Sequence, residues 1–174
     1  AKPRLARPRP IAGAGPVWRE AVREADIAAI RRLVAESGYF TGEETAIAAE
    51  LVEERVRRGR ISGYEFILTE IGGRIAGYAC YGPIPGTEHR FDLYWIVVDE
   101  SHRGTGLGRQ ILARVEDAVR RHGGERLYAE TSSTDHYAPT RAFYDATGFK
   151  KVAELPDFYR AGDGNLFYLK ELTP

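Results

Sequence analysis

The stretch VVDESHRGTGLGRQIL, residues 97–112, passes from two β-branched residues through a polar segment with three glycines into an apolar-spaced run. Its start is typical of a strand, and the spacing from Leu107 onward is typical of an amphipathic helix. The glycines at 104, 106 and 108 permit positive φ and let a ligand approach the backbone closely. Because the first turn of a helix has free N–H groups and a positive dipole end, this junction predicts a site for a phosphate or diphosphate.

Two common phosphate-binding motifs do not fit this junction. A dinucleotide fingerprint starting at Gly104 needs a glycine at position 109, where the chain has Arg109. A Walker A loop ends in Gly-Lys-Ser/Thr, whereas Arg109 and Gln110 follow Gly108. A tight glycine turn without a ligand is the alternative, but the adjacent Arg103 favours an anion-binding loop.

The periodicity on either side of the junction predicts an α/β fold of the α+β type, with one mixed sheet. Gly72-Gly73 is a signal for a two-residue hairpin turn, and Asp26 is a candidate N-cap for the first helix. We expect one domain at residues 16–174, preceded by a flexible, basic, Pro-rich arm at 1–15. In chain order, the patterns predict a strand at 16–22, helices at 26–38 and 47–59, strands at 64–71, 74–82 and 90–99, a helix at 107–123, a strand at 126–131, a helix at 138–148, and strands at 150–155 and 165–172.

Composition excludes several classes of function. Lys plus Arg is 25 and Asp plus Glu is 25, so no overall basic field favours nucleic acid as a partner. No apolar run reaches the roughly 18–20 residues of a membrane span. The single cysteine, Cys80, cannot form an intrachain disulfide, which favours a cytoplasmic setting. The four histidines are scattered without metal-ligand spacing, so we expect no metal site.

The pattern Arg103-x-x-Gly106-x-Gly108 closely resembles the coenzyme A signature of the GNAT superfamily of N-acetyltransferases. The segment RAFYDATGF, residues 141–149, is similar to a second motif of that superfamily, and the predicted order of elements matches as well. The resemblance covers about residues 16–172. It implies a sheet that splays at its centre, acetyl-CoA as cosubstrate, and direct transfer of the acetyl group to a primary amine in a ternary complex.

The resemblance also implies which residues bind the cofactor. The diphosphate would lie on the amides of the glycine loop, Arg103 to Arg109. The pantetheine arm would pair with the preceding strand like an added strand. An amide there, that of Val97, would polarise the thioester carbonyl. Tyr137 stands where the superfamily often has Asn, so a hydroxyl would replace an amide. The implied contacts are Ile96, Val97, Val98, Arg103, Gly104, Thr105, Gly106, Leu107, Gly108, Arg109, Tyr137, Thr140 and Phe143.

Three residues are candidates for the proton transfers. Tyr144 matches the superfamily's general acid, which protonates the leaving thiolate. Asp92, on the strand that leads to the loop, is a candidate base, although a solvent-facing charge on a strand explains it equally well. Glu130, on the strand at 126–131, is a second candidate with the same alternative. A chain of waters without a dedicated base is a third possibility.

The amine acceptor is less defined by the sequence. Three segments are candidates for contacting it: GYFTGEE at 38–44, YGPIPGTEHR at 81–90 and LPDFYRAGDG at 155–164. Their acidic residues, Glu43, Glu44 and Asp157, favour a cationic amine, and Phe158 and Tyr159 are candidate walls for the acceptor. A non-catalytic module that binds acyl-CoA is the alternative function, and a homodimer is a possible assembly.

Overall fold

The computed structural model describes residues 15–172, and the order of its elements confirms the order predicted from the sequence. All but the last residue of the predicted arm at 1–15 lies outside the described residues. The elements are β1 (Val17–Arg19), α1 (Glu24–Glu36), α2 (Gly42–Arg58), β2 (Glu65–Ile71), β3 (Arg74–Pro83), β4 (Arg90–Val98), α3 (Leu107–Arg121), β5 (Arg126–Ser132), α4 (Ala138–Ala146), β6 (Lys150–Arg160) and β7 (Asp163–Glu171).

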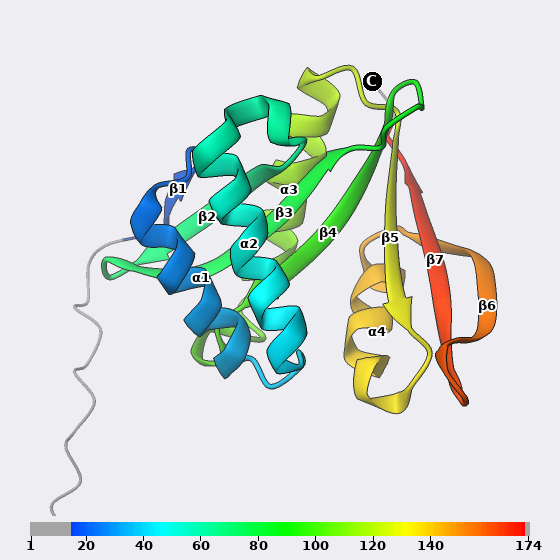
Figure 1. The fold of residues 1–174 in the computed structure, drawn as a ribbon. Coiled ribbons are helices and arrows are strands. Elements are labelled where there is room, and N and C mark those ends of the chain that lie inside the picture. Colours follow the sequence, from blue (N-terminus) through cyan, green and yellow to red (C-terminus); the bar gives the residue numbers. More distant parts are fainter. Residues whose placement is uncertain (1–14, 173–174) are drawn as a thin grey trace, which may run out of the picture.

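The strands form one seven-stranded mixed sheet in the order β1-β2-β3-β4-β5-β7-β6. Every neighbouring pair is antiparallel except β4 and β5, which are parallel and connected through α3. The helices α1 and α2 cover one face of the first four strands, and α3 lies behind the same strands (Figure 1). The predicted fold class, an α/β fold with one mixed sheet, is therefore confirmed.

The parallel pair at the centre of the sheet is short. Residues 90–93 of β4 pair with residues 126–129 of β5, and beyond this point the two strands diverge (Figure 1). Tyr94 is bulged, because Leu93 pairs with Tyr81 and Trp95 pairs with Cys80. A bulge bends its strand and shifts the alternation of side chains. The C-terminal half of β4 therefore keeps its pairing with β3 and leaves an open gap toward β5.

Two apolar cores hold the sheet, one on each face. The larger core joins the sheet to α3 and α4, and Ile111, Val115 and Val119 are fully buried in it, as their helical spacing predicts. The second core joins the sheet to α1 and α2. In α2 the apolar residues Ile47 and Val56 are exposed, and the buried stripe is Thr45, Ala48, Ala49 and Val52. Small side chains there permit close approach to α1.

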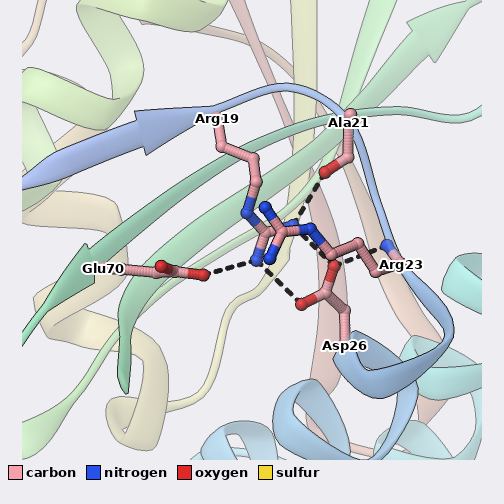
Figure 2. Close-up of polar contacts among 5 residues, drawn as sticks. All are labelled: Arg19, Ala21, Arg23, Asp26 and Glu70. Atoms are coloured by element: carbon pink, nitrogen blue, oxygen red, sulfur yellow. Dashed lines mark hydrogen bonds and ion pairs between the residues drawn. The ribbon is translucent and has the colours of Figure 1, made fainter. Parts of the chain in front are cut away.

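The start of α1 differs from the prediction. The N-cap is Arg23, and Asp26 lies in the first turn, where it accepts the Arg23 N–H at 2.7 Å. Figure 2 shows the Arg19 guanidinium between Asp26 and Glu70. It donates hydrogen bonds to both carboxylates at N–O distances of 2.6–2.8 Å. Burial alone would raise the pKa of Asp26, but the hydrogen bonds from Arg19 and Arg23 lower it below its ordinary value. This cluster ties α1 to β1 and β2.

Two connections bear directly on the predictions. The Gly72-Gly73 turn joins β2 to β3 with positive φ at both residues, 62° and 76°, as a tight hairpin requires. The strand β6 does not end at residue 155 but continues to Arg160. Its pairing with β7 is interrupted between Leu155 and Arg160, so this part bows away from its neighbour.

Among the helices of residues 15–172, none combines the length and the apolar character that a membrane span requires.

Candidate active site

A cavity of about 1190 Å³ lies at the gap between β4 and β5. The sequence predicts such an opening only through the family resemblance, because nothing local marks where the strands part. Residues from seven segments line it: 37–41, Glu44, 92–98, the glycine loop, 130–134, 136–144, and the hairpin at 159–163.

The glycine loop forms one end of the cavity. Gly104 and Gly106 have positive φ, 74° and 83°, and Gly106 is the N-cap of α3 without any side-chain cap. The free amides of this first helical turn therefore stay available to an anion. A Cβ built on Gly108 would lie 3.4 Å from the Phe143 ring, an ordinary van der Waals contact, so the first turn of α3 lies beside α4. These features fit a diphosphate.

Arg103 has its own contacts at this end. Its guanidinium donates to the Ser37 carbonyl at 2.8 Å and lies over the Tyr39 ring, 5.1 Å from the centroid. Across the cavity, the Tyr137 hydroxyl donates to the Tyr39 carbonyl at 2.8 Å. The loop between α1 and α2 is thus held to the glycine loop on one side and to the segment before α4 on the other.

The free edge of β4 presents backbone groups to the gap. The N–H of Asp99, just after β4, donates to the Ala76 carbonyl of β3 at 2.8 Å. Because N–H groups alternate in direction along an antiparallel ladder, the amide of Val97 also points to β3. The amides of Ile96 and Val98 then point to the gap. The amide of Val97, expected from the sequence to polarise the thioester, therefore does not face the gap, whereas the amides of its two neighbours do.

Tyr144 lies in α4 at the wall of the cavity. Its ring packs against Phe149 and Tyr168, with centroids 5.1 and 5.4 Å away, and only 5% of the residue is exposed. Burial, and then the nearby Tyr168, raises the pKa of Tyr144 well above its ordinary value. Its hydroxyl has no hydrogen-bond partner among the residues that the structure describes. The phenol thus remains protonated and free to donate.

Asp92 and Glu130 line the cavity on the sheet face opposite α3. Asp92 is paired in register with Tyr128, so Glu130 lies two residues further along the neighbouring strand on the same face. Burial, and then the charge of Glu130, raises the pKa of Asp92 to about 6. The buried Asn165 side chain donates to Glu130 at 3.0 Å. The two carboxylates are thus coupled, and one is held by a fixed donor.

Comparison with known proteins decides the family. The profile of the acetyltransferase (GNAT) family matches residues 27–149. A crystal structure from Desulfovibrio desulfuricans, assigned to the same family, is 45% identical and has a TM-score of 0.88, over 91% of this chain and all of that one. The chain belongs to the GNAT acetyltransferase family. The resemblance identified from the sequence is confirmed, together with the enzyme class and the acetyl-CoA cosubstrate that characterise this family.

Two curated GNAT relatives are more distant. The L-amino acid N-acyltransferase MnaT of Escherichia coli is 27% identical over 141 residues, 77% of this chain and 80% of that protein. The L-methionine sulfoximine/L-methionine sulfone acetyltransferase of Salmonella typhimurium is 29% identical over 100 residues, which is 56% of this chain. The match spans only 57% of the latter protein.

Most of the residues expected from the GNAT resemblance come together at the cavity. Thr105 is the exception, because its hydroxyl donates to the His102 carbonyl at 2.5 Å and it does not line the cavity. The remaining predicted residues line the cavity: Asp92, Ile96, Val97, Val98, Arg103, Gly104, Gly106, Leu107, Gly108, Arg109, Glu130, Tyr137, Thr140, Phe143 and Tyr144.

The acceptor segments are only partly those predicted. Glu44 and Tyr159 line the cavity, whereas Glu43, Asp157 and Phe158 do not, and neither does any residue of 81–90. Asp157 instead accepts the Gly162 N–H at 2.7 Å within the hairpin. Tyr94 and Trp95 at the cavity, and Asn165 behind Glu130, are not predicted from the sequence, and Arg160 and Asp163 are predicted only as members of the segment 155–164. The tract DFYRAGD is the only local signal for the hairpin residues, and nothing local identifies Asn165.

Proposed function

We propose that this GNAT protein transfers an acetyl group from acetyl-CoA to a primary amine of a small molecule, amino acid or peptide, by direct attack in a ternary complex. The observation that carries the proposal is the parted β4–β5 pair. It brings a glycine loop with free amides, an unpaired strand edge and three titratable side chains to one cavity. The curated relatives named for acylation of amino acids support an amine acceptor.

The glycine loop and the strand edge are the residues that would hold acetyl-CoA. The amides at the start of α3 bind the diphosphate, and Arg109, which reaches the Ala146 carbonyl at 3.4 Å, adds positive charge beside them. The free edge of β4 binds the pantetheine amides, so that either Ile96 or Val98 donates its N–H to the thioester oxygen. When bound, acetyl-CoA supplies an activated acetyl group.

Asp92 and Glu130 serve the incoming amine. An ammonium has no lone pair, so it must lose one proton before it attacks. With its pKa at about 6, Asp92 is mostly ionised at neutral pH and accepts that proton directly or through a water. Glu130, held by Asn165, keeps the local potential negative and stabilises the cationic nitrogen as it approaches.

Tyr144 serves the leaving group. Because its pKa is raised, the phenol keeps its proton at neutral pH. It donates that proton to the sulfur as the carbon–sulfur bond breaks, so the products leave as a neutral amide and a thiol. The nitrogen becomes cationic when it attacks and loses a second proton to solvent as the amide forms. The proton that Asp92 has taken is also released to solvent, and the phenol is reprotonated from solvent, so the net reaction releases one proton.

The test is a coupled assay with acetyl-CoA and a panel of amines. We expect release of CoA thiol and an amine product heavier by one acetyl group, measured by a thiol reagent and by mass spectrometry. Tight binding of acetyl-CoA with no thiol release for any amine would instead favour the alternative function, an acyl-CoA-binding module without catalysis.

A further inference from the structure

Charges of both signs line the cavity. The glycine loop contributes Arg103 and Arg109. Four carboxylates come from four other elements. These are Glu44 of α2, Asp92 of β4, Glu130 of β5 and Asp163 of β7. Such a distribution suits a phosphate-bearing cosubstrate at the glycine loop and a cation at the carboxylates.

Three of these carboxylates converge around one ring. Burial, then the charges of Glu130, Asp163 and Glu44 in that order, raise the pKa of Tyr159. The pKa of Tyr137, another residue of the cavity wall, is raised by burial and then by the charges of Glu44 and Asp163. Groups that perturb both rings lie near both, so Glu44 and Asp163 face a common space at the mouth of the cavity.

Aromatic rings form the walls of this space. Phe40 and Trp95 pack edge to face with centroids 5.0 Å apart, and both line the cavity with Tyr94, Tyr137 and Tyr159. Aromatic faces attract cations through the negative potential above the ring. Rings and carboxylates in the same wall therefore favour an organic cation over a neutral or anionic group.

A carboxylate on the acceptor would find little to bind. Among the cavity-lining residues that the structure describes, Arg160 is the only guanidinium outside the glycine loop. Its side chain is 76% exposed and its Nε lies 3.7 Å from Asp163, which partly neutralises it. An acceptor carboxylate there would also approach Glu44 and Asp163, and like charges repel.

We propose that the acceptor is an amine with a second cationic group, such as a diamine, rather than a free α-amino acid. This inference rests on the proposed acetyl transfer. The reacting nitrogen lies at Asp92 and Glu130, where the cavity meets the thioester position. The second cation lies against Glu44 and Asp163, within the walls of Tyr137 and Tyr159. These residues determine specificity, while Asp92 and Tyr144 serve the chemistry.

The test compares three acceptors with a five-carbon chain: cadaverine, n-pentylamine and 5-aminovalerate. Their far ends are cationic, neutral and anionic, respectively. We expect kcat/KM for cadaverine to exceed that for n-pentylamine by about tenfold, with aminovalerate lowest, since charge pairing in a half-buried site is worth about this factor. Equal rates for cadaverine and n-pentylamine, or a preference for aminovalerate, would overturn the inference but leave acetyl transfer intact. If no amine releases CoA, it is the proposed function that fails.

A charge-removing variant locates the second subsite. Glu44 accepts the Thr41 N–H at 2.9 Å in the capping box of α2, and a glutamine preserves that hydrogen bond. Glu44→Gln should therefore reduce the ratio of cadaverine to n-pentylamine about fivefold without loss of folding. Glu43→Gln is the matched control, because Glu43 precedes it on the same helix, is exposed and does not line the cavity. An equal effect of both substitutions would refute the assignment of Glu44.

Discussion

At the residue scale, Tyr144 combines a packed ring with a hydroxyl at the cavity. Tyr144→Phe keeps the ring contacts with Phe149 and Tyr168 and removes the proposed proton donor. We expect kcat to fall about 100-fold, as for loss of a general acid, with the KM for acetyl-CoA unchanged. Steady-state kinetics measure both. Tyr168→Phe is the control, because Tyr168 does not line the cavity, and an unchanged kcat in Tyr144→Phe would rule out the acid role.

Asp92 illustrates a conflict between stability and function in a single side chain. Its folded pKa, about 6, is above the ordinary 3.8, so the folded protein binds the extra proton. The contribution of Asp92 to the free energy of unfolding therefore becomes less favourable as pH rises from about 4 to 6. Asp92→Asn should raise the melting temperature at pH 7 but not at pH 4, and should lower kcat about 100-fold. Thermal melts and steady-state kinetics test the two effects.

The pH profile separates the two carboxylates. In the wild type, kcat/KM should rise with pH through about 6 as Asp92 ionises. Glu130→Gln removes the charge that helps to raise that pKa, so the rising limb should move to lower pH. Asp92→Asn should abolish the limb. A limb that stays in place in both variants would assign proton removal to water rather than to Asp92.

At the element scale, the sequence predicts the order and type of the helices and strands because most have a clear period and each helix is followed within two residues by a glycine. It also predicts the glycine loop, because two positive-φ residues at a strand–helix junction need glycine. It does not predict the bulge at Tyr94 or the end of pairing after Leu93. The end of pairing depends on contacts between β4 and β5, which are about 35 residues apart, and the bulge depends on the pairing of β4 with β3. No local period records either.

The same limit explains which site residues the sequence finds. Tyr144 belongs to a motif, and Asp92 and Glu130 lie on strands adjacent to the loop, so a resemblance identifies them. Asn165 contacts Glu130 only because β5 and β7 are neighbours in the sheet. Asp163 reaches the cavity through the hairpin, where it accepts the Ser132 hydroxyl at 2.5 Å. Both depend on tertiary structure.

The start of α1 gives a stability prediction at this scale. Asp26→Asn should lower the free energy of unfolding by about 2–3 kcal/mol, because it leaves the half-buried Arg19 with Glu70 as its single acidic partner. The Asp26 carboxylate has a lowered pKa, so its contribution is present above about pH 4 and is lost as pH falls through the folded value. Urea unfolding at pH 7 and pH 3 measures both.

An exposed ion pair supplies the control. Glu53 and Arg57 pair along α2 with 39% and 69% of their side chains exposed, so Glu53→Gln should cost less than about 0.5 kcal/mol. If Asp26→Asn lowers the free energy of unfolding by no more than this, the cluster in Figure 2 contributes no more to stability than an exposed ion pair.

At the scale of the whole molecule, the sheet consists of two parts joined by a short parallel pairing. The first part contains the strands β1 to β4, against which α1, α2 and α3 pack. The second part contains β5, β7 and β6. Between them, four residues of each strand are in register before the gap opens. A cosubstrate that pairs with the β4 edge would replace the missing strand contacts, so its binding energy would also stabilise the junction.

Hydrogen exchange tests this coupling without relying on activity. The amides of Ile96 and Val98 face the gap and should exchange fast in the free protein, because no strand pairs with them on that side. Saturating acetyl-CoA should slow both at least tenfold, whereas Val97, which points to β3, should change little. Free adenosine diphosphate is the control, since it occupies the glycine loop but has no pantetheine arm. Protection of Val97 instead of its neighbours would reverse the assigned direction of the β4 edge. Equal protection by both ligands would place the effect at the loop and remove the basis for pairing of the arm with β4.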